Sequence, residues 1–294
     1  MILYGMQLLS DVELPLTLPL EGEYKDTITL SSDVPQSLKD GLCCGTYLHT
    51  THKHKIYLYS NRDISEPMVA NQPLCYEAEG SVRFYWYHKS KTIYYEILET
   101  TMEEFGFWFV HPYFSLFLTI EEYFVLLHGS AIEIDGKSIL FLAPYKSGKS
   151  TLTHYLSQQG HKLIADDILP TFIQNDKVYY APSHPYSRPF RGAQALGVLM
   201  KNYKTTFGTI DTIYILRNNN ADSPVSITPV KGVEKFQLVR QNSIIYTIPH
   251  IRLKHEKHLG VMLNSINCFV MERPWGKEHI PTLYNEIIEH IHTL

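Results

Sequence analysis

Leu126 to Asp167 read LLHGSAIEIDGKSILFLAPYKSGKSTLTHYLSQQGHKLIADD, and this stretch decides the fold. An apolar run that ends at Ala143 leads into a short turn closing with Gly-Lys-Ser. Apolar residues then recur at i, i+3 and i+4, as on one face of a helix, and Gly160 follows as a C′ glycine would. A second apolar run ends in the adjacent carboxylates Asp166 and Asp167. Strand, turn, helix and strand predict a phosphate-binding βαβ unit.

The turn has the composition of a phosphate-binding loop, in which backbone N–H groups at a helix N-terminus surround phosphate oxygens. Gly148 lets the backbone approach closely, Lys149 is placed to bridge the β- and γ-phosphates, and the Ser150 hydroxyl is placed to ligate Mg²⁺. Ala143 stands where the usual pattern has glycine, and it tolerates a positive φ poorly. We predict that the loop binds ATP or another nucleoside triphosphate with Mg²⁺ through Ala143, Pro144, Tyr145, Lys146, Ser147, Gly148, Lys149, Ser150 and Thr151.

The composition of the 294 residues is that of an ordinary globular protein, with 44% hydrophobic and 19% charged residues. The formal charge of −4 argues against a nucleic-acid binder driven by bulk electrostatics. The N-terminus has no basic region and no cleavage pattern, and polar residues interrupt the most apolar segment, 105–127. We therefore expect no nucleic-acid partner, no membrane association and a cytoplasmic location.

The first 120 residues read mainly as strands and turns, so we expect a smaller β-rich domain there. One strand is expected over 46–59, and a partly helical segment over 100–118, broken or kinked at Pro112, is expected to pack under the nucleotide-binding sheet. Tyrosines gather in these strands. Aromatic enrichment is ordinary for strands, but exposed tyrosines and a strand edge also suit the docking of an extended peptide, and both interpretations stay open.

Histidines cluster in two places. His52 and His54 share one face of the predicted strand, while His49 points the other way. His255 and His258 fall in a basic stretch that we interpret as a solvated face. Neither cluster has convincing ligand geometry, so a metal-binding protein is a distant alternative.

The two carboxylates end the strand that follows the phosphate-loop helix, next to the place of a γ-phosphate. Of Asp166 and Asp167, one can hold Mg²⁺, directly or through water, while the other accepts a proton from an attacking hydroxyl. His128 lies on a strand that a hairpin turn joins to the strand before the loop, and it could orient an aspartate. The structural alternatives are a turn cap for the Asp-Asp pair and an ordinary core position for the histidine.

Residues 181–193 contain three prolines and no periodicity, as in a loop near the carboxyl ends of the strands. Arg188 and Arg191 in this loop are candidates for contact with phosphate or an acidic substrate. Ordinary surface arginines on a solvated loop are the alternative, which the sequence leaves equally open.

These motifs together resemble the catalytic domain of HPr kinase/phosphorylase, a bacterial serine kinase with a P-loop. The resemblance rests on three motifs in order, and it extends loosely from residue 121 to 294. They are His128-Gly129, Ser147-Gly148-Lys149-Ser150, and Gly160-His161 followed by Ala165-Asp166-Asp167. His128 stands 21 residues before Lys149, and Asp167 stands 17 after Ser150, separations that look like the family's. The resemblance implies an α/β fold. In it, a smaller β-rich domain over 1–120 precedes an HPr-kinase-like P-loop domain with a mixed sheet over 121–294.

The resemblance also implies roles for individual residues. Asp167 would accept the proton of the substrate hydroxyl, with His128 beside it. Lys149 would contact the phosphates of ATP, while Ser150 would hold Mg²⁺ and Asp166 would complete the acidic pair. The family's Glu-x-Arg-Gly segment is incomplete, because the glutamate place falls on Pro189 ahead of Arg191-Gly192, and no Gly-Arg-Asn loop is found. These departures favour simplified metal binding and a kinase that works in the forward direction only.

The opening residues, from Tyr4-Gly5-Met6 to Pro15, and the segment Leu127 to Ala131 resemble one branch of HPr-kinase-like proteins. That branch is encoded with ribosomally made peptides, notably lasso peptide tailoring kinases. It implies a precursor peptide as the partner and a serine, commonly the C-terminal one, as the acceptor. The alternatives are a serine kinase of an HPr-type carrier protein and a non-catalytic nucleotide-binding regulatory module. A homo-oligomer stays open.

Overall fold

The computed structural model describes residues 1–189, 196–220, 223–244, 248–264 and 266–294, and the backbone contacts divide the chain into two compact units. The first unit comprises Met1–Phe124 together with the start of helix α6 (Pro249–Leu263), as far as His255. The second unit comprises most of the remaining chain after Phe124, including the second half of α6 from Glu256 on. The boundary expected at residue 120 and the docking role of the first domain stay predictions.

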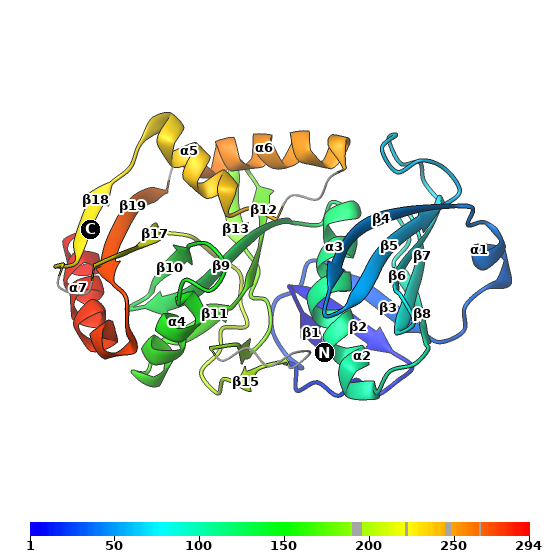
Figure 1. Ribbon diagram of the computed structural model, residues 1–294, viewed down its shortest axis with the longest axis horizontal. Coiled ribbons are helices and arrows are strands. Elements are labelled where there is room, and N and C mark those ends of the chain that lie inside the picture. The colour runs from blue at the N-terminus through cyan, green and yellow to red at the C-terminus, as the bar shows by residue number, and fades with distance from the viewer. Residues whose placement is uncertain (190–195, 221–222, 245–247, 265) are drawn as a thin grey trace. The chain divides into compact units, whose positions relative to one another are not determined.

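The first unit contains one eight-stranded sheet in the order β1-β2-β3-β8-β7-β6-β5-β4 (Figure 1). Its elements are β1 (Ile2–Leu3), β2 (Met6–Ser10), β3 (Thr27–Ser31), α1 (Gln36–Asp40), β4 (Cys44–Thr51), β5 (His54–Ser60), β6 (Pro73–Ala78), β7 (Val82–Tyr87) and β8 (Thr92–Ile97). The single strand expected over 46–59 is wrong, because β4 and β5 form a hairpin across His52 and Lys53. Both turn residues have positive φ, 46° and 71°, as two-residue hairpin turns require.

A helical segment follows the sheet and packs on it through aromatic rings. It consists of α2 (Met102–Trp108), a π-helical turn at Phe109–Tyr113 and α3 (Phe114–Ile120). Pro112 falls within the π turn, so the helix widens there instead of ending. The Tyr113 ring stacks on Phe84 of β7 at 4.1 Å between centroids. Within its own unit the helix packs on the apolar faces of β6 and β7, and the expectation that it packs under the nucleotide-binding sheet stays a prediction.

The second unit is built around a mixed sheet in the order β16-β13-β12-β9-β10-β17-β19-β18, with β11 also paired to β9. Its strands are β9 (Val125–Ile134), β10 (Lys137–Leu142), β11 (Lys162–Ala165), β12 (Ile168–Gln174), β13 (Lys177–Tyr180), β16 (Gly208–Thr209), β17 (Thr212–Asn219), β18 (Ser226–Pro229) and β19 (Asn267–Pro274). A small separate sheet pairs β14 (Tyr186–Ser187) with β15 (Val198–Leu199). The predicted α/β class with a mixed sheet is confirmed.

Helices cover both faces of this sheet, and each face has its own apolar core (Figure 1). On one face lie α4 (Lys149–Gln158) and α7 (Ile280–Thr293), the latter through a buried stripe of Leu283, Ile287 and Ile291. Side chains of α5 (Gly232–Gln241) and of the second half of α6 belong to the core on the other face. Among the described residues, none of the helices has the length and apolar character needed to cross a membrane.

The histidines of α6 are buried, so the solvated face expected there is wrong. His255 is 3% exposed and His258 is 8% exposed. The His258 ring lies 2.9 Å from the Thr171 hydroxyl, from Nε2 to Oγ1, and so its polar atom is satisfied inside the unit. Helix α6 carries these rings inward, whereas the sequence shows only their spacing among lysines.

Strand β9 lies in the middle of the second sheet and pairs on both sides. It is antiparallel to β10 on one side and antiparallel to β11 and then β12 on the other. The predicted βαβ unit therefore has β9 between its two parallel strands. The break between β11 and β12 is the Asp166-Asp167 pair, beside Gly129 and Ser130 of β9. A Cβ on Gly129 would lie 2.7 Å from Leu142 and 2.8 Å from the Phe141 carbonyl, so only glycine fits.

Candidate active site

The phosphate loop runs from Ala143 to the start of α4. Its left-handed residues are Lys146 and Gly148, with φ of 61° and 83°, while Ala143 is buried outside the left-handed region. Alanine at the first position of the motif is therefore unstrained. Inside the loop the Ser147 hydroxyl donates to the Pro144 carbonyl at 2.6 Å, which closes the turn. The first turn of α4 has no intrahelical partner for its N–H groups, so the loop has the donors that bind an anion.

Helix α4 ends as its sequence predicts. Gly160 is left-handed, with φ of 101°. Its N–H donates to the Ser157 carbonyl, and the N–H of His161 donates to the Leu156 carbonyl. This pair of bonds is the Schellman arrangement, which fixes the path of the chain from α4 into β11.

The Lys149 side chain is only 5% exposed and points back across the loop. Its ammonium donates to the carbonyls of Ala143 and Pro144, at 2.7 and 3.1 Å, and lies 3.2 Å from Nε2 of His128. Because an ammonium can only donate, Nε2 is the acceptor and the neutral ring carries its proton on Nδ1. The loop lysine and the β9 histidine, 21 residues apart in sequence, are thus in direct contact.

His128 connects Lys149 to the acidic pair. Its Nδ1 lies 3.4 Å from Oδ1 of Asp167, and its backbone pairs with Ile168 at the start of β12. Lys149, His128 and Asp167 therefore form a continuous polar chain from the phosphate loop to a carboxylate. The strand register holds this chain in place, because β9 pairs with the strands on both sides.

Asp167 is the accessible carboxylate of the pair. Its φ of 77° is unusual for a residue other than glycine and falls at the break between β11 and β12. Its Oδ2 lies 3.9 Å from a guanidinium nitrogen of Arg188, so the carboxylate faces a histidine and an arginine at long range. Of the two predicted arginines, Arg188 is thus brought to the site, and Arg191 lies outside the described residues.

Asp166 is 1% exposed and accepts three hydrogen bonds. The donors are the hydroxyl of Ser130 at 2.5 Å, the hydroxyl of Ser187 at 3.1 Å and the backbone N–H of Arg188 at 2.7 Å. A carboxylate offers about four acceptor positions, so one position remains. The geometry makes Asp166 the residue that ties β9 to the 187–188 loop, and its metal role stays a prediction. Within the described ranges, no group of three or more His, Cys, Asp or Glu side chains is arranged to hold a metal ion.

Two residues of this region were not singled out from the sequence. Ser130 and Ser187 bind Asp166, and neither carries a spacing signal that would have identified it. His184 is fully buried nearby, and its burial lowers its pKa to about 4, against the opposing influence of Asp166 and Asp167. A neutral histidine is therefore part of the wall behind the carboxylates.

No family model matches the chain. The HPr kinase/phosphorylase of Lachnoclostridium phytofermentans is 22% identical over 177 residues, which cover 57% of this chain and 55% of that protein. The HPr kinase/phosphorylase of Lacticaseibacillus casei is 24% identical over 179 residues, which cover 56% of this chain and 53% of that protein. The chain is a distant relative of HPr kinase/phosphorylase. It spans about half the length of these curated relatives.

A solved structure also matches, the Hpr(Ser) kinase/phosphatase from Coxiella burnetii. The match has 14% sequence identity and a TM-score of 0.38, and it covers 57% of this chain and 90% of the other. The two curated relatives support the resemblance noted from the loop, the histidine and the acidic pair at the level of distant sequence relationship, and they do not address the lasso peptide branch.

Proposed function

We propose that the protein is an ATP- and Mg²⁺-dependent kinase that phosphorylates a serine hydroxyl of a ribosomally made precursor peptide. The acceptor would be the C-terminal serine of a lasso peptide precursor, modified in the cytoplasm. The observation that supports the kinase is the chain Lys149–His128–Asp167, which joins a phosphate loop to an accessible carboxylate. The distant relationship to HPr kinase/phosphorylase supports the same reaction class.

In the proposed reaction Asp167 accepts the proton of the serine hydroxyl as its oxygen attacks the terminal phosphorus. The new bond joins the serine oxygen to phosphorus, and the bond from that phosphorus to the bridging oxygen breaks, leaving a nucleoside diphosphate. Nδ1–H of His128 donates toward the Asp167 carboxylate and keeps it oriented. The Lys149 ammonium would exchange the carbonyls of Ala143 and Pro144 for phosphate oxygens.

The residues at the loop fit Mg²⁺ held mainly by the nucleotide. Mg²⁺ keeps several waters and takes one or two protein ligands beside substrate phosphates, so a cage of carboxylates is not required. Ser150 follows Lys149 at the start of α4, and Asp166 has one acceptor position left for the ion or for a water on it. Bound Mg²⁺ would neutralise charge on the transferring phosphate. Ser150 and Asp166 are the residues that we propose to hold it.

The proposal of a peptide substrate draws on the first unit. Strand β4 ends the eight-stranded sheet, is eight residues long and is largely exposed, with Tyr47 54% exposed. Such an edge can add an extended peptide as a further strand, with side-chain pockets giving specificity. The expectation that tyrosines here dock a peptide thus stays a prediction. Of the tyrosines on which this expectation rests, Tyr85 and Tyr95 are buried and belong to the core of the unit instead.

A second candidate substrate is a folded carrier protein of HPr type. It is favoured by the names of the curated relatives, each of which is an HPr kinase/phosphorylase. The chemistry at Asp167 would be the same for both substrates. A third possibility, a nucleotide-binding module without catalysis, predicts that nucleotide binds and that no acceptor gains a phosphate.

The test is phosphate transfer from Mg·ATP by the full chain to a precursor peptide ending in serine. Matched acceptors are the same peptide ending in alanine and an HPr-type carrier protein. We expect the serine peptide alone to gain the mass of a phosphate. Transfer to the carrier alone would overturn the peptide assignment and keep the kinase. ATP binding with no transfer to either acceptor would favour the regulatory module.

A further inference from the structure

A hollow beside the phosphate loop is not used by the proposed reaction. It has a volume of about 220 Å³, and its walls come from the start of α4, from the segment after β19 and from the start of α7. Strands β10, β17 and β19 are parallel neighbours, so the phosphate loop and the end of β19 lie at the same edge of the sheet. Ligands of α/β proteins bind at this edge. The lining side chains include Thr151, Leu152, Arg273, Trp275 and Ile280.

Trp275 is the exposed tryptophan of the chain. It is 51% exposed, whereas Trp86 and Trp108 are fully buried in the first unit. It stands against the loop, because a Cβ on Gly148 would lie 3.4 Å from its ring. A large aromatic ring left half open beside an anion-binding loop offers a flat surface for a planar ligand.

Arg273 lines the hollow and is a buried cation. It is 3% exposed, its Nη2 donates to the Ser147 carbonyl of the loop, and its guanidinium lies 5.7 Å from the Trp275 ring centre. Its Nε has no hydrogen-bond partner, and no carboxylate among the described residues forms an ion pair with it. Burial lowers the pKa of this arginine, since water no longer stabilises its charge. A buried cation of this kind is stabilised by an anion next to it.

We propose that Trp275 stacks on the base of the nucleoside triphosphate and that Arg273 gives its charge to the phosphates between the base and the loop. The inference rests on the proposed nucleotide at the phosphate loop and adds the site for its base. The base fits the hollow because a single ring system is smaller than the drug-sized ligands that fill pockets of about 300–1,000 Å³. Stacking on an aromatic ring accepts any base, so the site predicts modest preference among nucleotides.

The test compares Mg·ATP with Mg·tripolyphosphate, which has the phosphates and lacks the base. Titration calorimetry on the full chain gives the two dissociation constants for the wild type, Trp275→Ala and Trp275→Phe. We expect Trp275→Ala to weaken ATP about tenfold or more and to leave tripolyphosphate unchanged. Trp275→Phe should restore most of the ATP affinity, because a phenyl ring still stacks.

The outcomes separate this site from the proposed function. Unchanged ATP affinity in Trp275→Ala, or equal weakening of both ligands, would overturn the base site and leave the phosphate loop standing. Failure of the wild type to bind either ligand would overturn the base site together with the proposed function.

The proposed role of Arg273 is tested by separate variants. Arg273→Gln should weaken ATP and tripolyphosphate by similar factors, because both ligands carry the phosphates, and Arg273→Lys should recover part of the loss. Unchanged affinity for both ligands in Arg273→Gln would contradict the charge assignment. Since Trp86 and Trp108 are remote from solvent, ATP should change the fluorescence of the wild type and leave that of Trp275→Phe unchanged. A change that persists in Trp275→Phe would count against stacking on Trp275.

Discussion

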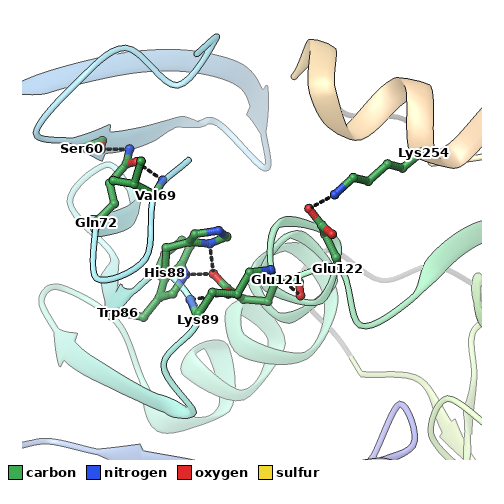
Figure 2. A network of polar contacts seen from close by, with 9 residues as sticks. All are labelled: Ser60, Val69, Gln72, Trp86, His88, Lys89, Glu121, Glu122 and Lys254. Carbon is green, nitrogen blue, oxygen red and sulfur yellow. Dashed lines mark hydrogen bonds and ion pairs between the residues drawn. The ribbon is translucent and has the colours of Figure 1, made fainter. Parts of the chain in front are cut away.

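Each unit carries a pair of adjacent carboxylates, Glu121-Glu122 in the first and Asp166-Asp167 in the second, and both pairs follow the same plan. The first member is buried and accepts three hydrogen bonds. For Glu121 the donors are Trp86, His88 and the backbone of Lys89, at 2.8, 2.9 and 2.7 Å (Figure 2). The second member has a positive φ, 60° at Glu122 and 77° at Asp167, and its side chain has partners other than those of the first member.

We call the buried first member of each pair the inward carboxylate and the second member the outward carboxylate. The two pairs differ in the partners of the outward carboxylate. Glu122 forms an ion pair with Lys254 at 2.6 Å between groups that are both largely open to solvent (Figure 2). Asp167 instead faces His128 and Arg188 at 3.4 and 3.9 Å, next to the phosphate loop. A buried carboxylate bound by several fixed donors holds structure, whereas a carboxylate that faces a histidine and an arginine beside a phosphate loop is placed for chemistry. The arrangement that the two carboxylate pairs share is therefore not sufficient to form an active site.

The largest expected effect is on catalysis by Asp167→Asn. The amide cannot accept the proton of the hydroxyl, so we expect kcat for phosphate transfer to fall by about 10²–10⁴-fold while ATP binding is retained. Single-turnover transfer and calorimetric binding measure the two separately. The matched control is Glu122→Gln, which should leave kcat at the wild-type value. If Asp167→Asn transferred phosphate at the wild-type rate, Asp167 would not be the base. The two carboxylate pairs would then not differ in function.

The next effect concerns stability and the inward carboxylates. Glu121→Gln should lower the free energy of unfolding of the first unit by about 3 kcal/mol, because the amide group cannot satisfy all three buried donors. Urea unfolding followed by the fluorescence of Trp86 and Trp108 in a Trp275→Phe background reports on this unit. Asp166→Asn should destabilise the second unit in the same way, which the fluorescence of Trp275 follows in a chain that retains this residue. Unchanged midpoints in both variants would show that these carboxylates do not hold their units together.

Acid should weaken folding through His255, where burial lowers the pKa to about 4. In the unfolded chain the pKa of histidine is about 6.5. Between about pH 6.5 and 4 the unfolded chain therefore binds a proton that the folded chain does not bind. The contribution of the neutral ring is complete above pH 6.5, and about 2 kcal/mol of it is lost between pH 7 and 5. The variant His255→Gln should show a correspondingly smaller loss over this interval. An identical pH dependence in the variant would contradict the burial of a neutral ring.

The smallest effect is expected at the outward carboxylate of the first unit. The variant Lys254→Ala removes a pair whose side chains are 59% and 36% exposed, so the free energy of unfolding should change by at most about 1 kcal/mol. Thermal unfolding at low and high salt measures it, and salt should reduce any difference. A loss as large as that of Glu121→Gln would mean that the inward and outward members do not differ in the proposed way.

Local sequence was enough to predict the phosphate loop and its helix. Gly148, Lys149 and Gly160 act within a few residues of where they stand, so turn and cap chemistry identified their places. The contact between His128 and Asp167 was inferred from motif order, and the structure places them 3.4 Å apart, although their catalytic roles stay predictions.

The sequence did not predict features that depend on which distant strands and helices become neighbours. Trp275 and Arg273 reach the loop only because β19 lies two strands from β10, across 125 residues of chain. The hairpin at His52 and Lys53 lacks the glycine or asparagine that usually marks such a turn. The burial of His255 depends on which side of α6 meets its neighbours, and the low amphipathic contrast of that helix gave no indication.

Strand β9 has one further consequence. It presents His128 while hydrogen-bonding to the strand that delivers the phosphate loop and to the strand that delivers the acidic pair. The positions of His128 and of the acidic pair are therefore fixed along a single segment, and β10 connects that segment to the loop that places Lys149 at the start of α4. Since a one-residue slip of a strand reverses which face each side chain points to, inserting one residue between Gly129 and Ile132 would shift part of β9 against β10 and should disturb the contact between His128 and Lys149. Strand β9 is thus the element whose pairing aligns the phosphate loop with the acidic pair in the candidate site.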